Sequence, residues 1–394
     1  MKKILLLGGS AQQIIAIKTA KKHGYYTVLC DFLPDNPGQY EADKFYLIST
    51  TDKEAVLKVA IEEKVDGVLA YASDPAAPTA AYVSEKLGLP TNTYASVNTL
   101  CNKDKFRKFL KNNGFNTPYA KGYSDKNVDR SHFSLPVIVK PVDSSGSKGA
   151  TVLKSWEGLN DALDFAFSFS RSHRVIVEEF IEKKHKYLIG GDIFVYRGKI
   201  ILWGLLNCHR DNSVNQLVPV GKSYPLALDE EDKKSVQNTL QKMVERLGIK
   251  FGSVNIELII DKNGKVWPID VGPRAGGNMI PDLLGMIFGV DVVEMAVLTA
   301  MGEKIDGTIK AGVPFYATHN LHTNKNGTYE KIIFSPEIED KIVKKCIYKK
   351  PGDWIEYFDN ASKALGIVFM KFNNQEEMNR ILDNINRYYK VVIR

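Results

Sequence analysis

Cysteine and long apolar runs are scarce in this sequence. It has four cysteines among 394 residues, and no two of them form a Cys-x-x-Cys pair. This excludes a dense disulfide framework and the usual cysteine-based zinc and redox motifs, and it favours a reducing compartment, so we expect a cytoplasmic protein. No apolar run approaches the roughly 20 residues of a membrane-spanning helix. The run Ile4–Leu7 is too short for the core of a signal peptide and fits a buried strand. We therefore expect no membrane partner.

The sequence also lacks a strong excess of one charge. Lys and Arg number 53 against 46 Asp and Glu, which gives a formal net charge of +7. Basic residues exceed acidic ones within 101–190, which favours an anionic ligand such as nucleotide phosphates, although a solvated basic face explains the count equally well. The basic residues do not alternate with aromatic ones along a stripe, so we expect no nucleic-acid partner.

The first hundred residues alternate short apolar runs with amphipathic stretches. Ile4–Leu7, Thr27–Leu29 and Gly67–Ala70 are candidate buried strands, and Asp52 is a candidate cap for a helix whose inward face includes Val56, Leu57, Ala60 and Ile61. This alternation predicts a parallel, doubly wound sheet. The Gly8-Gly9-Ser10 turn lacks the G-x-G-x-x-G pattern, so a tight turn explains it better than dinucleotide binding.

The remainder mixes helices with hairpins. A helix is expected over 102–113, with Phe106, Phe109 and Leu110 inward, and another after Asp229, ending at Gly248. The stretch 135–153 predicts a hairpin with a Gly/Ser loop, and 252–271 predicts a second hairpin around the turn at 262–265. Residues 311–394 contain both strand and helix patterns.

Two segments carry the chemistry. The strand 135–140 delivers Lys140 at its end, and the loop Asp143–Gly149 follows, whose small residues let backbone N–H groups approach phosphate oxygens. The hairpin at 252–271 would place Glu257 and Asp270 side by side, and two carboxylates plus phosphate oxygens are typical of a Mg²⁺ site. Arg274 follows closely and puts a cation beside them. The alternative to a phosphate-binding loop is an ordinary Gly-rich turn, and the alternative to a metal site is a pair of solvated acids at a sheet edge.

Together with Arg174–Ile181, a strand that runs into two acids, these segments resemble the ATP-grasp superfamily over nearly the whole chain. The resemblance implies a multidomain α/β and α+β fold. Residues 1–100 would form a doubly wound, Rossmann-like pre-ATP-grasp domain, and 101–310 an ATP-grasp domain with a small lid subdomain at about 118–182. Residues 311–394 would form a C-terminal mixed α/β domain that completes the grasp fold.

The resemblance also implies roles for individual residues. Lys103 and Lys140 would meet the ATP phosphates, the Glu178 side chain the exocyclic amine of adenine, and Arg274 the γ-phosphate and acyl phosphate. Arg274 and Lys140 are the expected catalytic residues, and Glu257 and Asp270 the expected metal ligands. The expected nucleotide-binding residues are Lys103, Lys140, Ser144, Ser145, Gly146, Ser147, Gly149, Glu178, Glu179, Phe180 and Ile181.

Several positions depart from the family pattern. The second metal acid is usually Glu, and Gly272 stands where an Asn is usual, so Asn278 or water would complete the metal shell. The ribose-binding acid is missing at its usual place, with Glu182 or Asp192 as substitutes. The expected substrate contacts are His209, Arg210, Gly276, Gly277 and Asn278.

We therefore expect an ATP- and Mg²⁺-dependent ligase, with Mn²⁺ as an alternative metal, that joins a small-molecule carboxylate to an amine through an acyl phosphate. A homodimer would be in keeping with the resemblance. One alternative is a bicarbonate-activating enzyme of the carboxylase or carbamoyl phosphate synthetase type. Another is an ATP-binding module without catalysis. The sequence does not identify the substrates.

Overall fold

The structure is a computed structural model that describes residues 1–305 and 308–394. The N-terminal part is a four-stranded parallel sheet of order β3-β2-β1-β4, as the alternating pattern predicts. Its strands are β1 (Lys3–Leu7), β2 (Tyr26–Asp31), β3 (Lys44–Leu47) and β4 (Gly67–Leu69). The accompanying helices are α1 (Ile14–Lys22), η1 (Pro37–Tyr40), α2 (Lys53–Glu63), α3 (Ala77–Leu87) and α4 (Tyr94–Leu100).

Local signals account for these elements. The Asp52 carboxylate accepts a hydrogen bond from the Ala55 N–H and caps α2, as predicted. Val56 and Ala60 pack into the sheet, whereas Ile61 is 56% exposed, so its predicted inward position is wrong. Helical spacing alone does not fix how wide the covered stripe of a short helix is.

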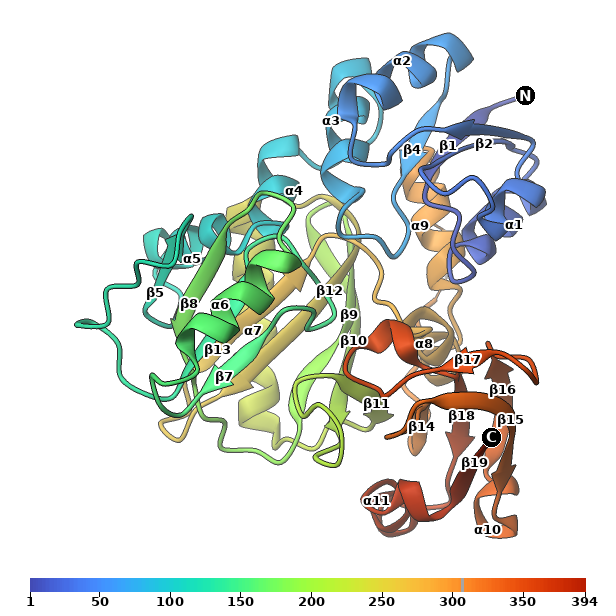
Figure 1. The fold of residues 1–394 in the computed structure, drawn as a ribbon. Helices are drawn as coiled ribbons and strands as arrows, with labels where there is room; N and C mark the ends of the chain where they lie inside the picture. Colours follow the sequence, from blue (N-terminus) through green and yellow to red (C-terminus); the bar gives the residue numbers. More distant parts are fainter. Residues whose placement is uncertain (306–307) are drawn as a thin grey trace.

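A second, antiparallel sheet of order β5-β8-β6-β7 forms the lid, drawn in green in Figure 1. It follows α5 (Lys103–Asn112), whose Phe106 and Leu110 are buried as predicted. The predicted hairpin at 135–153 is confirmed as β6 paired with β7. The lid elements are β5 (Ala120–Tyr123), β6 (Val137–Pro141), β7 (Thr151–Leu153), α6 (Leu159–Ser168) and β8 (Val175–Glu179).

The largest sheet has eight strands in the order β13-β12-β9-β10-β11-β14-β18-β16. It crosses the domain boundary predicted at residue 310, because its last three strands come from the C-terminal part (Figure 1). The helix predicted after Asp229 is α7, which is capped by that residue and ends at Gly248 in the left-handed conformation. The strands and helices are β9 (Leu188–Tyr196), β10 (Lys199–Arg210), β11 (Pro219–Tyr224), α7 (Glu230–Leu247), β12 (Phe251–Ile260), β13 (Val266–Gly272), β14 (Tyr316–Leu321), β16 (Ile342–Ile347) and β18 (Gly366–Lys371).

A small sheet of order β17-β15-β19 covers the C-terminal end of the molecule. Met378, Ile381, Leu382 and Ile385 are buried there and belong to one apolar cluster. The elements are β15 (Gly327–Phe334), α10 (Pro336–Glu339), β17 (Trp354–Ile355), η2 (Ala361–Lys363), α11 (Gln375–Leu382), η3 (Ile385–Arg387) and β19 (Tyr389–Ile393).

Two apolar helices, α8 (Ile280–Phe288) and α9 (Val292–Ala300), connect the parts. α8 packs on the large sheet, and α9 packs against α1 and β4 of the N-terminal sheet. No single helix in the described ranges is long and apolar enough to cross a membrane. The pair α8 and α9 meets the length and composition limits only when joined across a bend of 111°.

Candidate active site

A cleft of about 1540 Å³ lies between the lid, the large sheet, the N-terminal domain and the C-terminal part. Nearly all residues predicted to bind nucleotide, metal or substrate line it, although they come from distant parts of the sequence. The three exceptions are Gly149, Gly276 and Asp192, one of the two substitutes expected for the ribose-binding acid. A Cβ at Gly149, where φ is +74°, would lie 3.1 Å from Phe169 and from Pro141, so this glycine serves the packing of the loop.

Lys140 is held at the end of β6 by a buried ion pair. Its ammonium lies 2.6 Å from the Glu178 carboxylate on β8. The other Glu178 oxygen accepts from Arg107 Nε at 2.8 Å. Burial alone would raise the pKa of Glu178, but the cations of Arg107 and Lys140 lower it to about 2. Burial also lowers the pKa of Lys140. Glu178 therefore fixes Lys140, a role that the sequence analysis missed; the contact of Lys140 with phosphate and that of Glu178 with adenine stay predictions.

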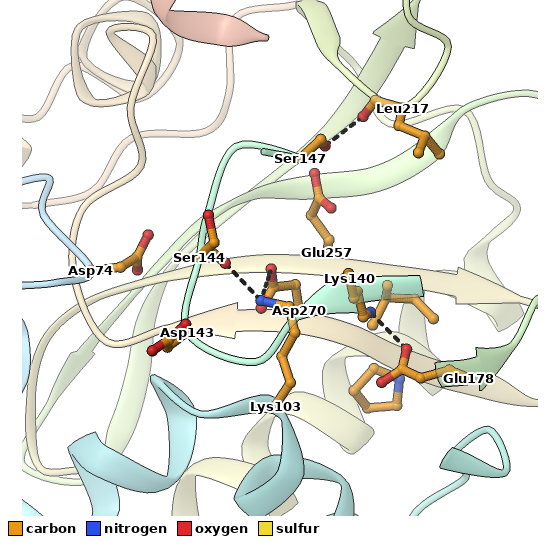
Figure 2. A network of polar contacts seen from close by, with 12 residues as sticks. Asp74, Lys103, Lys140, Asp143, Ser144, Ser147, Glu178, Leu217, Glu257 and Asp270 are labelled. Atoms are coloured by element: carbon orange, nitrogen blue, oxygen red, sulfur yellow. Dashed lines mark hydrogen bonds and ion pairs between the residues drawn. The ribbon is translucent and has the colours of Figure 1, made fainter. Parts of the chain in front are cut away.

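The Gly/Ser loop lies over the cleft and is fastened on both sides (Figure 2). Lys103 Nζ donates to the Ser144 carbonyl at 2.8 Å, and Ser147 Oγ donates to the Leu217 carbonyl at 2.8 Å. Gly146 and Ser147 both have positive φ, +67° and +61°, a reversal that the glycine allows without strain. The loop thus connects the lid to the large sheet across the predicted phosphate site.

Glu257 and Asp270 are direct partners across β12 and β13, as the predicted hairpin requires. Each is half-buried and faces a cation: Arg210 Nη2 lies 3.2 Å from Glu257, and Lys103 Nζ lies 3.6 Å from Asp270 (Figure 2 shows both acids and Lys103). No cluster of three or more His, Cys, Asp or Glu suited to a metal exists in 1–305 or 308–394. Two hard oxygen donors on one cleft wall nevertheless fit Mg²⁺, which takes few protein ligands and adds phosphate oxygens and water.

Arg274 is fixed from the N-terminal domain. Its guanidinium forms a two-pronged ion pair with Asp74, in which Nε donates at 2.8 Å. Burial would raise the pKa of Asp74, but Arg274 lowers it below its ordinary value. Arg274 lines the cleft as predicted, and its positive charge is neutralised by Asp74, which lies 200 positions earlier in the sequence.

Asp192 is not a ribose-binding acid. It is 1% exposed, and its two oxygens accept from the Gly276 N–H at 2.7 Å and from Asn255 Nδ2 at 2.8 Å. Burial raises its pKa despite these bonds. Gly276 therefore acts through its backbone, positioning the loop after Arg274 rather than contacting a substrate. Glu182 is exposed and lines the cleft, so it remains the candidate ribose acid.

His209 and Arg210 line the cleft where β10 ends. His209 Nε2 is 2.8 Å from Ser223 Oγ, and its ring packs against that of Tyr187 at 4.5 Å between centroids, with the two planes tilted by 49°. Desolvation lowers the pKa of His209 to about 3, so the imidazole is neutral at physiological pH. Gly277 and Asn278 line the cleft nearby, and the Asn278 N–H donates to Gln12. Substrate contact by these residues stays a prediction.

Comparisons with known proteins agree with this architecture. The ATP-grasp domain profile matches residues 100–278. A formate-dependent phosphoribosylglycinamide formyltransferase of Prochlorococcus marinus is 30% identical over 189 residues, 46% of this chain and 48% of that protein, so the match spans about half of the relative's length. The L-amino acid ligase of Bacillus licheniformis superposes with a TM-score of 0.82 at 19% identity, over 100% of this chain and 99% of that one.

A further structure extends the likeness to carboxylases. The biotin carboxylase domain of the Hydrogenobacter thermophilus 2-oxoglutarate carboxylase, in complex with MgADP and bicarbonate, has a TM-score of 0.73 at 16% identity. That alignment covers 100% of this chain and 91% of the other. At such identities the structures establish the fold, and the profile match establishes the domain. Residues 100–278 form an ATP-grasp domain, and the chain as a whole shares its fold with these solved structures.

Proposed function

We propose that this protein is an ATP- and Mg²⁺-dependent ligase that joins a small carboxylic acid to an amine through an acyl phosphate. The observation that carries the proposal is the gathering of Lys103, Lys140, Glu257 and Asp270 around one cleft beneath a Gly/Ser loop. ATP-grasp enzymes use ATP and Mg²⁺, and the relatives found here include ligases that form C–N bonds. The complete set of cleft charges favours catalysis over a module that only binds nucleotide.

In the proposed reaction, this chain mainly positions groups and balances charge. A carboxylate oxygen of the acid attacks the γ-phosphorus, the bond to the β–γ bridging oxygen breaks, and ADP leaves. Lys103 and Lys140 would neutralise the phosphate oxygens, while the Gly/Ser loop shields the acyl phosphate from water. Glu257 and Asp270 would hold Mg²⁺, which supplies further neutralisation of phosphate oxygens when bound.

The second half of the reaction needs only an amine and a place for its proton. The amine nitrogen attacks the acyl carbon, the C–O bond to phosphate breaks, and phosphate leaves with the bonding pair. The proton that the nitrogen loses passes to the departing phosphate. Arg274 lines the same cleft and would stabilise the negative charge of the acyl phosphate and of the departing phosphate. A bicarbonate-activating enzyme would share the first half, so dependence on bicarbonate separates the two proposals.

The test is release of ADP and phosphate from Mg-ATP with pooled amino acids and small carboxylates, with and without bicarbonate. We expect release that depends on one pool, and a loss of at least about a hundredfold in Glu257→Gln. Glu245→Gln is the matched control, because Glu245 lies exposed on α7 away from the cleft. Unchanged turnover in a folded Glu257→Gln variant would contradict the metal assignment.

A further inference from the structure

Two lysines that line the cleft are buried, and only one of them has a counter-charge. Lys140 is 7% exposed and is paired with Glu178. Lys222 is 6% exposed, and within 1–305 and 308–394 no carboxylate lies within 4.0 Å of its ammonium. The described side chain that its ammonium contacts is the thiol of Cys208. Burying an ammonium without an opposite charge is costly, so this position favours an anionic ligand.

Lys222 points from the same face of the sheet as the metal acids. On β11 it is the register partner of Cys208 on β10, which in turn pairs with Leu188 on β9. Two residues further along β9, Gly190 is the register partner of Glu257 on β12. Because register partners and alternate residues of a strand share a face, Lys222 and Glu257 both rise from the floor of the cleft.

Gly190 leaves room for the Lys222 ammonium between these strands. A Cβ built at Gly190 would lie 3.0 Å from Lys222 Nζ and 2.3 Å from Cys208 Sγ. The lysine side chain therefore extends from β11 over β10 and reaches β9, the strand next to Glu257. With neighbouring strands about 4.8 Å apart, the ammonium stands within roughly two strand spacings of the Glu257 carboxylate.

The other cations near the metal acids already have protein partners. Arg274 is paired with Asp74, Arg210 with Glu257, and Lys103 with Asp270. Because these cations are paired with carboxylates of the protein, none of them is free to bind the acid substrate at the floor of the cleft. The Lys222 ammonium is placed to bind it.

We propose that Lys222 binds the carboxylate of the acid substrate and holds it beside the position of the γ-phosphate. This inference rests on the ligase proposal and adds to it the residue that anchors the attacking acid. The ligand that fits is a small carboxylate, since one ammonium satisfies one singly charged group. Because the ammonium would touch the reacting group, we expect its removal to raise the KM for the acid without changing the KM for ATP.

The experiment compares Lys222→Met, which keeps the aliphatic stem, with Lys222→Arg, which restores a cation. Lys199→Met is the control for the loss of one positive charge, because Lys199 lies exposed at the start of β10. The probes are bicarbonate, acetate, succinate, L-alanine and L-glutamate, each assayed singly with Mg-ATP for ADP release. Binding of each ¹⁴C-labelled acid in the presence of Mg-ADP is measured in parallel by equilibrium dialysis.

We expect Lys222→Met to raise the KM and the Kd of the acid roughly ten- to a hundredfold, the loss of affinity typical of one charge-assisted hydrogen bond. Lys222→Arg should recover part of that loss, and Lys199→Met should behave as the wild type. The melting temperature of Lys222→Met should be equal to or above that of the wild type, because an unpaired buried charge has been removed. A purely structural lysine would instead give a lower melting temperature with unchanged affinity for the acid.

The outcomes separate the two proposals. Binding of an acid that depends on Lys222, without turnover in the wild type, would retain the anchor and reject the ligase. Turnover that depends on Glu257 but is unaffected by Lys222→Met would retain the ligase and reject the anchor. Absence of binding of every acid to the wild type, or equal affinity in the wild type and Lys222→Met, would overturn the anchor.

Discussion

The most direct test of the site's architecture is to neutralise Glu178 at the centre of the buried charge cluster. Glu178 is 2% exposed and accepts hydrogen bonds from Arg107 and Lys140 at once. Glu178→Gln keeps the shape of the side chain but leaves two buried cations without a counter-charge. We expect this variant to unfold more easily and to bind ATP more weakly, because Lys140 is no longer held at the phosphate site.

The pKa of Glu178 sets the magnitude. A carboxyl whose pKa falls from 4.5 to about 2 on folding contributes roughly 3 kcal/mol of stability at neutral pH. Loss of one partner of a buried ion pair costs about 3–5 kcal/mol in other proteins, which agrees with this value. Urea unfolding followed by far-UV circular dichroism measures the difference. ATP affinity is measured separately by calorimetry.

Glu179→Gln is the matched control, because Glu179 is the next residue of the same strand. It is half-buried and accepts only a long bond from the Tyr119 N–H at 3.3 Å, so its loss should cost less than about 1 kcal/mol. The Glu178 contribution is complete above the unfolded pKa and declines as pH falls through the folded pKa, so the two variants should converge only near pH 2. Equal destabilisation by the two substitutions at pH 7 would refute the reasoning.

Two further predictions use other charged groups. Asp74→Asn removes the charged partner of the buried Arg274 and should lower the free energy of unfolding in urea by about 3 kcal/mol. Asp66→Asn removes an exposed carboxylate on the same domain and should have a much smaller effect. Similar losses in the two variants would contradict a stabilising role of the Asp74–Arg274 pair. The pKa of His209 is about 3, below its ordinary 6.5, because burial disfavours the charged imidazole. Its contribution to stability is therefore complete above pH 6.5 and is lost as pH falls toward 3. The free energy of unfolding should fall by up to about 1.4 kcal/mol per pH unit in that range. The unfolding free energy of His209→Asn should therefore depend less steeply on pH between 6.5 and 4 than that of the wild type, and equal slopes would exclude this role.

Much of the fold could be predicted because its signals are local. The Asp52 cap, the Gly248 C-cap and the turn at 262–265 each lie within a few residues of the element they define. The course of the large sheet could not be predicted in the same way. β14 pairs with β11, whose residues lie more than ninety positions earlier, and β18 and β16 extend the sheet from β14. Nothing in the local pattern of β14 specifies that partner.

The same distinction applies to the site. Glu257 and Asp270 could be paired from the sequence because one hairpin carries both. The pair of Arg274 with Asp74 joins two domains, so no spacing rule reveals it. Lys222 sits in a short strand of mixed polarity, where its charge resembles that of any solvated residue, and only the register of β11 on β10 shows that its ammonium is buried.

The charged side chains of the cleft pair with one another, so a charged ligand that binds there must take the place of one member of a pair. Lys103 faces Asp270 at 3.6 Å and Arg210 faces Glu257 at 3.2 Å, so each metal acid is neutralised by a cation. A divalent cation between the two acids would repel both neighbours and release them toward anionic oxygens. At the proposed site, nucleotide phosphates and a metal would therefore favour each other's binding, since each would neutralise the charge that the other exposes. Lys222 stands outside this exchange because none of the residues that the structure describes offers it a carboxylate, and this is the physical reason for assigning it to the second substrate rather than to the nucleotide.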